Sequence, residues 1–182
     1  MSALRAVVDS PEDQLGQCEG TGMTIVIGDS IPDVELRVMT GKSPEAVRSR
    51  DVLGKGKVVL FAVPGAFTPT CSDYHLPGFV HRADDLLAKG VDTIACISVN
   101  DPFVMGAWGR DQKVGDKVLM LADGNGDFTQ AMGLEADMGG AGLGTRSQRY
   151  AAVIEDGVVT ALLVEPERGL NVSSADSVLA TL

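Results

Sequence analysis

Clusters of lysine and arginine are missing from the sequence, which carries 15 basic residues against 25 acidic ones. Proteins that bind nucleic acid present such clusters to the phosphate backbone. The formal net charge of -10 at pH 7 therefore argues against a nucleic-acid partner. We attribute the acidity to solubility rather than to a specific partner.

Long apolar runs are also absent. No stretch approaches the roughly 18 residues that a membrane-spanning helix requires, and the first 22 residues are polar, without the apolar core of a secretory signal. We therefore expect a soluble, cytoplasmic protein with no membrane partner.

Cysteine is scarce, with three residues at positions 18, 71 and 96. An odd number without the spacing of a small disulfide scaffold argues against a secreted framework and favours free thiols. A chain of 182 residues that is 45% hydrophobic can form one core. Residues 1–22 lack helical or strand periodicity, so we expect an N-terminal extension there and one domain over residues 23–182.

Apolar patterns within that domain predict alternating strands and helices. Short strands are expected over residues 24–27 and 34–39 at a sheet edge, followed by a polar connection over residues 40–56. Three continuously apolar runs have the length of buried strands: residues 58–63, 93–99 and 118–121. Apolar spacing and capping residues predict three helices: residues 71–89 with a kink at Pro77, residues 102–113 and residues 128–132.

The C-terminal part begins with a glycine-rich stretch, residues 133–144, which we expect to be an irregular loop. Asp156-Gly157 then predicts a hairpin between strands 150–154 and 158–164, because this dipeptide tolerates positive φ. Ser173 to Asp176 resembles a capping box that opens a last helix to Leu182. This order predicts an α/β fold, a mixed sheet with helices on both faces.

The chemistry centres on Cys71, at the point where a buried strand gives way to a helix. Unpaired N–H groups and the helix dipole favour a thiolate in a first helical turn. The alternative is that Cys71 is a small buried hydrophobic residue. Against this, Pro64 and Pro69 fix the preceding loop, and the Thr68 hydroxyl is placed to hydrogen-bond the sulfur and then a bound oxygen.

The spacing Pro64-x-x-x-Thr68-x-x-Cys71 resembles the peroxiredoxin signature, and the chain from Met23 to Leu182 resembles the type II, or peroxiredoxin-5, subgroup. Further similar stretches are residues 75–79, 96–104, 122–126 and 142–150. The resemblance implies a thioredoxin-like fold and a homodimer. It also implies reduction of hydrogen peroxide and alkyl hydroperoxides without a metal or other cofactor, in antioxidant defence and redox homeostasis.

The resemblance gives a role to the arginine just before the hairpin, Arg149 here, with Arg146 as its competitor. A guanidinium beside the sulfur stabilises the thiolate and donates hydrogen bonds to the peroxide oxygens. Attack by Cys71 would leave a sulfenic acid, with Thr68 and Arg149 aligning the O–O bond. Pro64 completes the expected catalytic set.

A second thiol must then restore Cys71. In the family it comes from the same chain, from glutathione and glutaredoxin, or from thioredoxin. Cys96 is the internal candidate within the domain, but its mid-strand position favours an inert thiol. Mammalian type II enzymes carry a late resolving cysteine where this chain has Val172. We therefore expect an external reductant, with glutathione and glutaredoxin preferred; Cys18 has no support.

Other residues leave alternatives open. His75 lies one helical turn after Cys71, where it either activates the thiol and shuttles protons or packs the helix. Trp108 is expected in the core or an interface, and His81 in solvent. Asp123 to Asp127 imitates the start of a calcium loop, but Phe128 replaces the required glycine, so no metal site is expected.

Two other function classes are alternatives to the peroxidase hypothesis. A Cys-His hydrolase would use Cys71 and His75 for acyl transfer, although no orienting Asn or Asp accompanies the pair. A redox-sensing or chaperone-like protein would instead pass Cys71 oxidation to a partner. Multiple turnover of peroxide with a reductant distinguishes the peroxidase from both.

Overall fold

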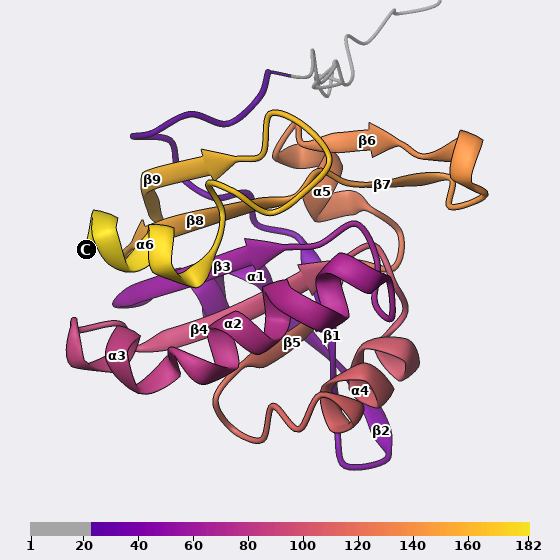
Figure 1. Ribbon diagram of the computed structural model, residues 1–182, viewed down its shortest axis with the longest axis horizontal. Coiled ribbons are helices and arrows are strands. Elements are labelled where there is room, and N and C mark those ends of the chain that lie inside the picture. Colours follow the sequence, from indigo (N-terminus) through magenta and orange to yellow (C-terminus); the bar gives the residue numbers. More distant parts are fainter. Residues whose placement is uncertain (1–22) are drawn as a thin grey trace, which may run out of the picture.

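The computed structural model describes residues 23–182 (Figure 1). Residues 1–22, with the predicted extension and Cys18, lie outside the described residues. No helix in the described part is long and apolar enough to cross a membrane.

Seven strands form one mixed sheet in the order β2-β1-β5-β4-β3-β8-β9. Strands β3, β4 and β5 run parallel, while β1, β8 and β9 pair antiparallel with their neighbours. The predicted mixed sheet is confirmed. The strand bounds are β1 Glu35–Thr40, β2 Ser43–Arg48, β3 Lys57–Ala62, β4 Thr93–Ser98, β5 Leu119–Ala122, β8 Tyr150–Glu155 and β9 Val158–Val164.

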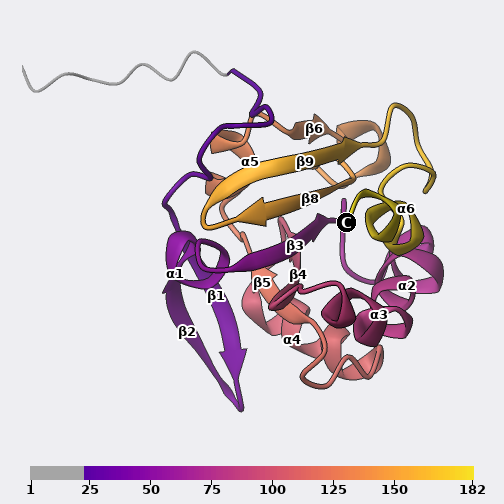
Figure 2. The same cartoon turned by 90° about the vertical axis from the view of Figure 1, so that its left-hand side faces the viewer.

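Helices cover both faces of this sheet, as Figure 2 shows. In β3, Val59 and Phe61 pack into the core beneath α2, α3, α4 and α6, whereas Val58 and Leu60 face α1 and α5. Burial on both faces explains why the strand is continuously apolar. The helix bounds are α1 Ser49–Leu53, α2 Leu76–His81, α3 Ala83–Ala88, α4 Pro102–Asp111, α5 Asp127–Ala131 and α6 Ala175–Thr181.

The hairpin between β8 and β9 is confirmed. Asp156 and Gly157 form its turn with φ values of 47° and 83°, the left-handed pair that a tight primed turn requires. The strand predicted over residues 24–27 is wrong. There the Asp29 carboxylate accepts the Val26 N–H at 2.9 Å and turns the chain, and no strand forms between Met23 and the start of β1.

The polar connection predicted over residues 40–56 is also wrong, since it contains β2 and α1. A turn with Gly41 at φ 63° closes the β1–β2 hairpin. Strand β2 is therefore the edge strand, and β1 lies inside the sheet. Most β2 side chains are exposed, so the sequence carries no apolar alternation that would reveal the strand.

The helix predicted over residues 71–89 is three shorter helices. A π-helix, η1 (Cys71–His75), leads into α2, and the chain breaks at Arg82 before α3 rather than kinking at Pro77. The Leu76 N–H donates to the Cys71 carbonyl, five residues back. Pro77 has no N–H and lies in the first turn of α2, where the missing donor is tolerated.

Two smaller corrections concern the C-terminal part. The stretch predicted as an irregular loop, residues 133–144, holds strand β6 (Glu135–Asp137) and the 3₁₀ turn η2 (Gly139–Ala141), and β6 pairs with β7 (Thr145–Ser147), which directly follows the stretch. Helix α6 is capped by Ser174, whose hydroxyl accepts the Ser177 N–H at 3.2 Å. The predicted cap, Ser173, is instead buried against Glu165.

Candidate active site

Cys71 opens the π-helix η1 and is fully buried. The loop before it is held by a hydrogen bond from the Ala66 N–H to the Asn100 side chain at 3.0 Å. Within this loop Phe67 adopts a φ of 62°, a conformation that is uncommon for a non-glycine residue and occurs often at functional sites. The sulfur is therefore presented by a fixed backbone.

Arg149 donates from Nη2 to the Cys71 sulfur at 3.3 Å. Strand β8 brings it there: Tyr150 pairs with Ala62 at the carboxyl end of β3, so the preceding residue lies beside the loop that leads to Cys71. Arg146, its competitor, donates to the Leu143 and Val99 carbonyls at 2.8 and 3.0 Å. It thereby links the loop before β7 to the loop after β4. Of the two arginines, Arg149 contacts the sulfur.

Thr68 does not form the expected hydrogen bond to the sulfur. Its hydroxyl donates to the Gly65 carbonyl at 2.8 Å. A hydroxyl has one proton, so Thr68 is left as an acceptor toward anything that binds beside it.

His75 is buried and bonded at both ring nitrogens. Nδ1 accepts from Arg149 Nη1 at 2.9 Å, and Nε2 donates to the Ser173 carbonyl at 3.0 Å. Burial and then the Arg149 charge lower the pKa of His75 to about 4, although the Ser173 bond and Glu165 oppose this. The ring is therefore neutral near pH 7, with its proton on Nε2.

Glu165 and Ser173 are site residues that the sequence did not reveal. Glu165 Oε1 accepts three hydrogen bonds, from the Asn171 N–H at 2.8 Å and from the Ser173 N–H and hydroxyl at 2.8 and 2.7 Å. Burial alone raises the pKa of Glu165, but the bonds from Ser173 and Asn171 outweigh it and lower the pKa. Glu165 directly follows β9, the only positional signal the sequence offers for it.

Cys96 lies in β4 opposite Phe61 of β3 and is fully buried. Burial and then the proximity of Cys71 raise the pKa of the Cys96 thiol well above its usual value, and Arg149 only partly opposes them. Cys71 and Cys96 are both free thiols.

A cavity of about 330 Å³ adjoins the site. Pro64, Thr68 and Arg149 line it together with the apolar side chains of Met138 and Leu143. Residues 23–182 contain no group of three or more Asp, Glu, His or Cys side chains that could hold a metal ion. The arrangement suits a buried thiolate that meets a small, partly apolar substrate.

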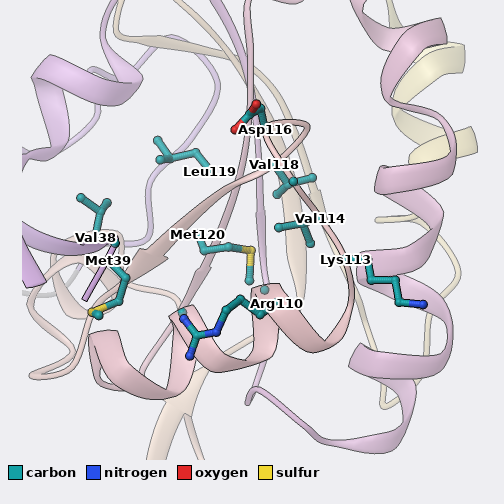
Figure 3. A pocket seen from close by; sticks show the side chains of 13 residues that line it. Val38, Met39, Arg110, Lys113, Val114, Asp116, Val118, Leu119 and Met120 are labelled. Carbon is teal, nitrogen blue, oxygen red and sulfur yellow. The ribbon is translucent and has the colours of Figure 1, made fainter. Parts of the chain in front are cut away.

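A larger cavity, about 800 Å³, lies elsewhere, between α4 and strands β1 and β5 (Figure 3). Figure 3 shows Met39, Met120, Arg110 and Lys113 around it. Neither Cys71 nor Arg149, which donates a hydrogen bond to the Cys71 sulfur, lines this cavity. Cavity size therefore does not identify the chemical site.

Trp108 and His81 lie as the sequence predicted. Trp108 is buried in α4, and its Nε1 donates to Ser72 Oγ at 3.0 Å. His81 is exposed at the end of α2.

Comparison with known proteins connects this geometry to a chemistry. The family model described as Redoxin matches residues 27–179. Among curated relatives, chloroplastic Peroxiredoxin-2E of Arabidopsis thaliana is 49% identical over 164 residues, which cover 87% of this chain and 70% of the relative. Peroxiredoxin-2B of the same plant is 46% identical over 159 residues, covering 87% of this chain and 98% of the relative.

Solved structures agree. Reduced Prx3 from Vibrio vulnificus in complex with hydrogen peroxide superposes with a TM-score of 0.83 and 51% identity, covering 87% of this chain and 99% of that one. Peroxiredoxin 5 from Alvinella pompejana gives a TM-score of 0.77 and 37% identity, covering 86% and 97%. The thioredoxin-like fold is thereby confirmed.

Proposed function

Because the chain belongs to the redoxin family, as a type II peroxiredoxin and hence a thiol peroxidase, we propose that Cys71 is its peroxide-attacking residue, with Arg149, Thr68 and Pro64 around it. The observation that carries this proposal is the 3.3 Å hydrogen bond from Arg149 to the Cys71 sulfur. A cation that donates to sulfur stabilises the thiolate, which is the nucleophilic form.

The reaction then proceeds in two stages. The Cys71 thiolate attacks one oxygen of ROOH, an S–O bond forms, and the O–O bond breaks to release RO⁻, which takes up a proton as ROH. Arg149 donates to the oxygen that gains negative charge, and Thr68 accepts a hydrogen bond from the peroxide O–H. The resulting Cys71 sulfenic acid condenses with a thiol, releasing water, and a second thiol reduces the mixed disulfide.

The cavity supports hydrogen peroxide and alkyl hydroperoxides as substrates. Thr68 and Arg149 contribute polar groups to its lining, and Met138, Ala141 and Leu143 contribute an apolar part of its wall. An alkyl group can bury surface against that wall while the peroxide meets the polar groups. By removing such oxidants, the protein would serve antioxidant defence and redox homeostasis in the cytoplasm.

His75 serves this reaction by orienting Arg149 rather than by moving protons. Both of its nitrogens are engaged, by Arg149 and Ser173, and its pKa near 4 keeps it neutral. A hydrolase that uses His75 as the base for Cys71 would need a free ring nitrogen facing the sulfur. The observed bonds leave none.

We expect the reductant to be an external thiol, either glutathione with glutaredoxin or thioredoxin. Cys96 is held inside β4, with the raised pKa of an inert thiol, and Val172 provides no thiol in the last loop. Cys96→Ser should therefore keep wild-type peroxide turnover with whichever reductant supports the wild type. Steady-state peroxide consumption, measured separately with each reductant, tests the function and names the donor.

In that assay the absence of turnover by wild-type protein with either donor would contradict the proposed function. Loss of turnover in Cys96→Ser alone, with the fold intact by circular dichroism, would instead make Cys96 the resolving cysteine. The melting temperature of each variant serves as the control.

We propose a homodimer joined near the active-site loops. Three aromatic side chains are exposed there: Phe67 at 53%, Tyr74 at 68% and Phe103 at 60%. Exposed aromatic residues are enriched at interfaces between proteins. Phe103→Ser should shift the sedimentation coefficient from dimer to monomer, whereas Leu87→Ser on α3 should not. A wild-type protein that sediments as a monomer would contradict the dimer.

A further inference from the structure

A continuous chain of hydrogen bonds links the Cys71 sulfur to the Glu165 carboxylate. It runs from the sulfur to Arg149 at 3.3 Å, from Arg149 to His75 at 2.9 Å and from His75 to the Ser173 carbonyl at 3.0 Å. The Ser173 N–H and hydroxyl then bind Glu165 Oε1. The nucleophile is thereby connected to an anion that no step of the reaction uses.

Glu165 is held unusually deep for a carboxylate, with 8% of its surface exposed. Its Oε1 takes all three donors, while its Oε2 has no hydrogen-bond partner within residues 23–182. Burying a carboxylate with one oxygen unsatisfied costs free energy. A buried carboxylate at such a cost is expected where it holds other groups in place. Glu165 holds the backbone of residues 171–173 through its three hydrogen bonds.

The orientation of that backbone matters because of His75. The Ser173 carbonyl can only accept, so it requires the His75 proton on Nε2 and leaves the Nδ1 lone pair for Arg149. Arg149 is in turn fixed from its main-chain side, since its carbonyl accepts the Glu165 N–H at 3.0 Å. Glu165 thus constrains Arg149 through the strand pairing and through the His75 ring.

We propose that Glu165 is a positioning residue for peroxide reduction: by holding Ser173 it fixes the His75 tautomer and so aims Arg149 at Cys71. The inference rests on the proposed function for its reaction but not for its geometry. Three charged or titratable groups lie around the sulfur: Arg149, which donates to it, His75, which accepts from Arg149, and Cys96 of β4, whose pKa is raised in part by Cys71. Of these, Arg149 is the cation whose placement Glu165 controls.

The test is Glu165→Gln, with Glu155→Gln as the matched control. Glu155 ends β8 of the hairpin that leads to Glu165, where it forms a partly exposed pair with Lys57 at 3.1 Å, and Glu155→Gln removes the same charge. Alkylation of Cys71 by iodoacetamide is followed by mass spectrometry of its peptide, so that the other cysteines do not contribute. In Glu165→Gln we expect the midpoint of the pH profile to rise by about one unit and the rate constant for peroxide to fall about tenfold.

A merely structural role would lower the melting temperature of Glu165→Gln but leave its alkylation profile on the wild-type curve, and that result would overturn the inference. If Glu165→Gln fails to fold, Ser173→Ala removes one of the three donors to Oε1 and should move the profile in the same direction by less. An unmoved profile in a folded Ser173→Ala would then count against the proposal.

A double-mutant cycle tests the route through His75. In a His75→Asn background, Glu165→Gln should cause little further loss of peroxide reactivity, because the variant no longer contains the imidazole whose tautomer Glu165 fixes. A second full tenfold loss there would show that Glu165 acts by another route. Alkylation involves no peroxide, so wild-type protein that fails to turn over peroxide would sink the proposed function and leave this inference testable.

Discussion

Replacing Cys71 by serine should abolish peroxide turnover, with a loss on the order of 10⁴-fold or more. A serine hydroxyl in the same place stays protonated near neutral pH and is a far weaker nucleophile toward peroxide oxygen than a thiolate. The measurement is steady-state peroxide consumption with each reductant. Trapping of a sulfenic acid by dimedone should label Cys71 in the wild type and nothing in the variant.

The matched control for this experiment is Cys96→Ser, which removes the other buried thiol of the core and should still turn over peroxide. Serine is close to cysteine in size, so both variants should fold, as circular dichroism would verify. Full activity in Cys71→Ser would refute the proposed mechanism at its first step.

Replacing Arg149 by lysine should slow the reaction with peroxide about 100-fold although the charge is kept. The guanidinium uses two nitrogens at once, Nη2 for the Cys71 sulfur and Nη1 for His75. A lysine ammonium is a single point on a flexible stem and cannot reproduce this fork. Stopped-flow rates with hydrogen peroxide, together with the pH profile of Cys71 alkylation, measure the loss.

Arg146→Lys provides the comparison, since Arg146 binds two main-chain carbonyls rather than the sulfur. It should lower the melting temperature more than the peroxide rate. If Arg146→Lys lost more reactivity than Arg149→Lys, the assignment of the two arginines would have to be reversed.

The sequence predicted most of the sheet because burial on both faces leaves continuous apolar runs, as at residues 58–63, and because Asp156-Gly157 encodes its own turn. It failed where an element is short and solvated. Strand β2 presents mainly polar, exposed side chains, and β6 and β7 are three residues each. Periodicity cannot distinguish such segments from loops.

Some residues of the site could be predicted from the sequence and others could not. The resemblance placed Arg149 near Cys71 although 78 positions separate them, and the pairing of β3 with β8 supplies the physical reason. The neutral His75 was not predictable, because its state depends on burial and on two partners distant in sequence. Ser173 acts through its carbonyl, a group that every residue carries, so no side-chain pattern could have revealed it.

The hydrogen bond between Trp108 and Ser72 gives the protein its own optical probe. Trp108 is the only tryptophan, and its indole binds the residue next to the nucleophile at 3.0 Å, with the Phe67 ring 6.5 Å away. Any shift of η1 when the sulfur gains an oxygen changes the surroundings of this one fluorophore. The intrinsic emission of the unlabelled protein can therefore report each oxidation and each reduction of Cys71 as it happens.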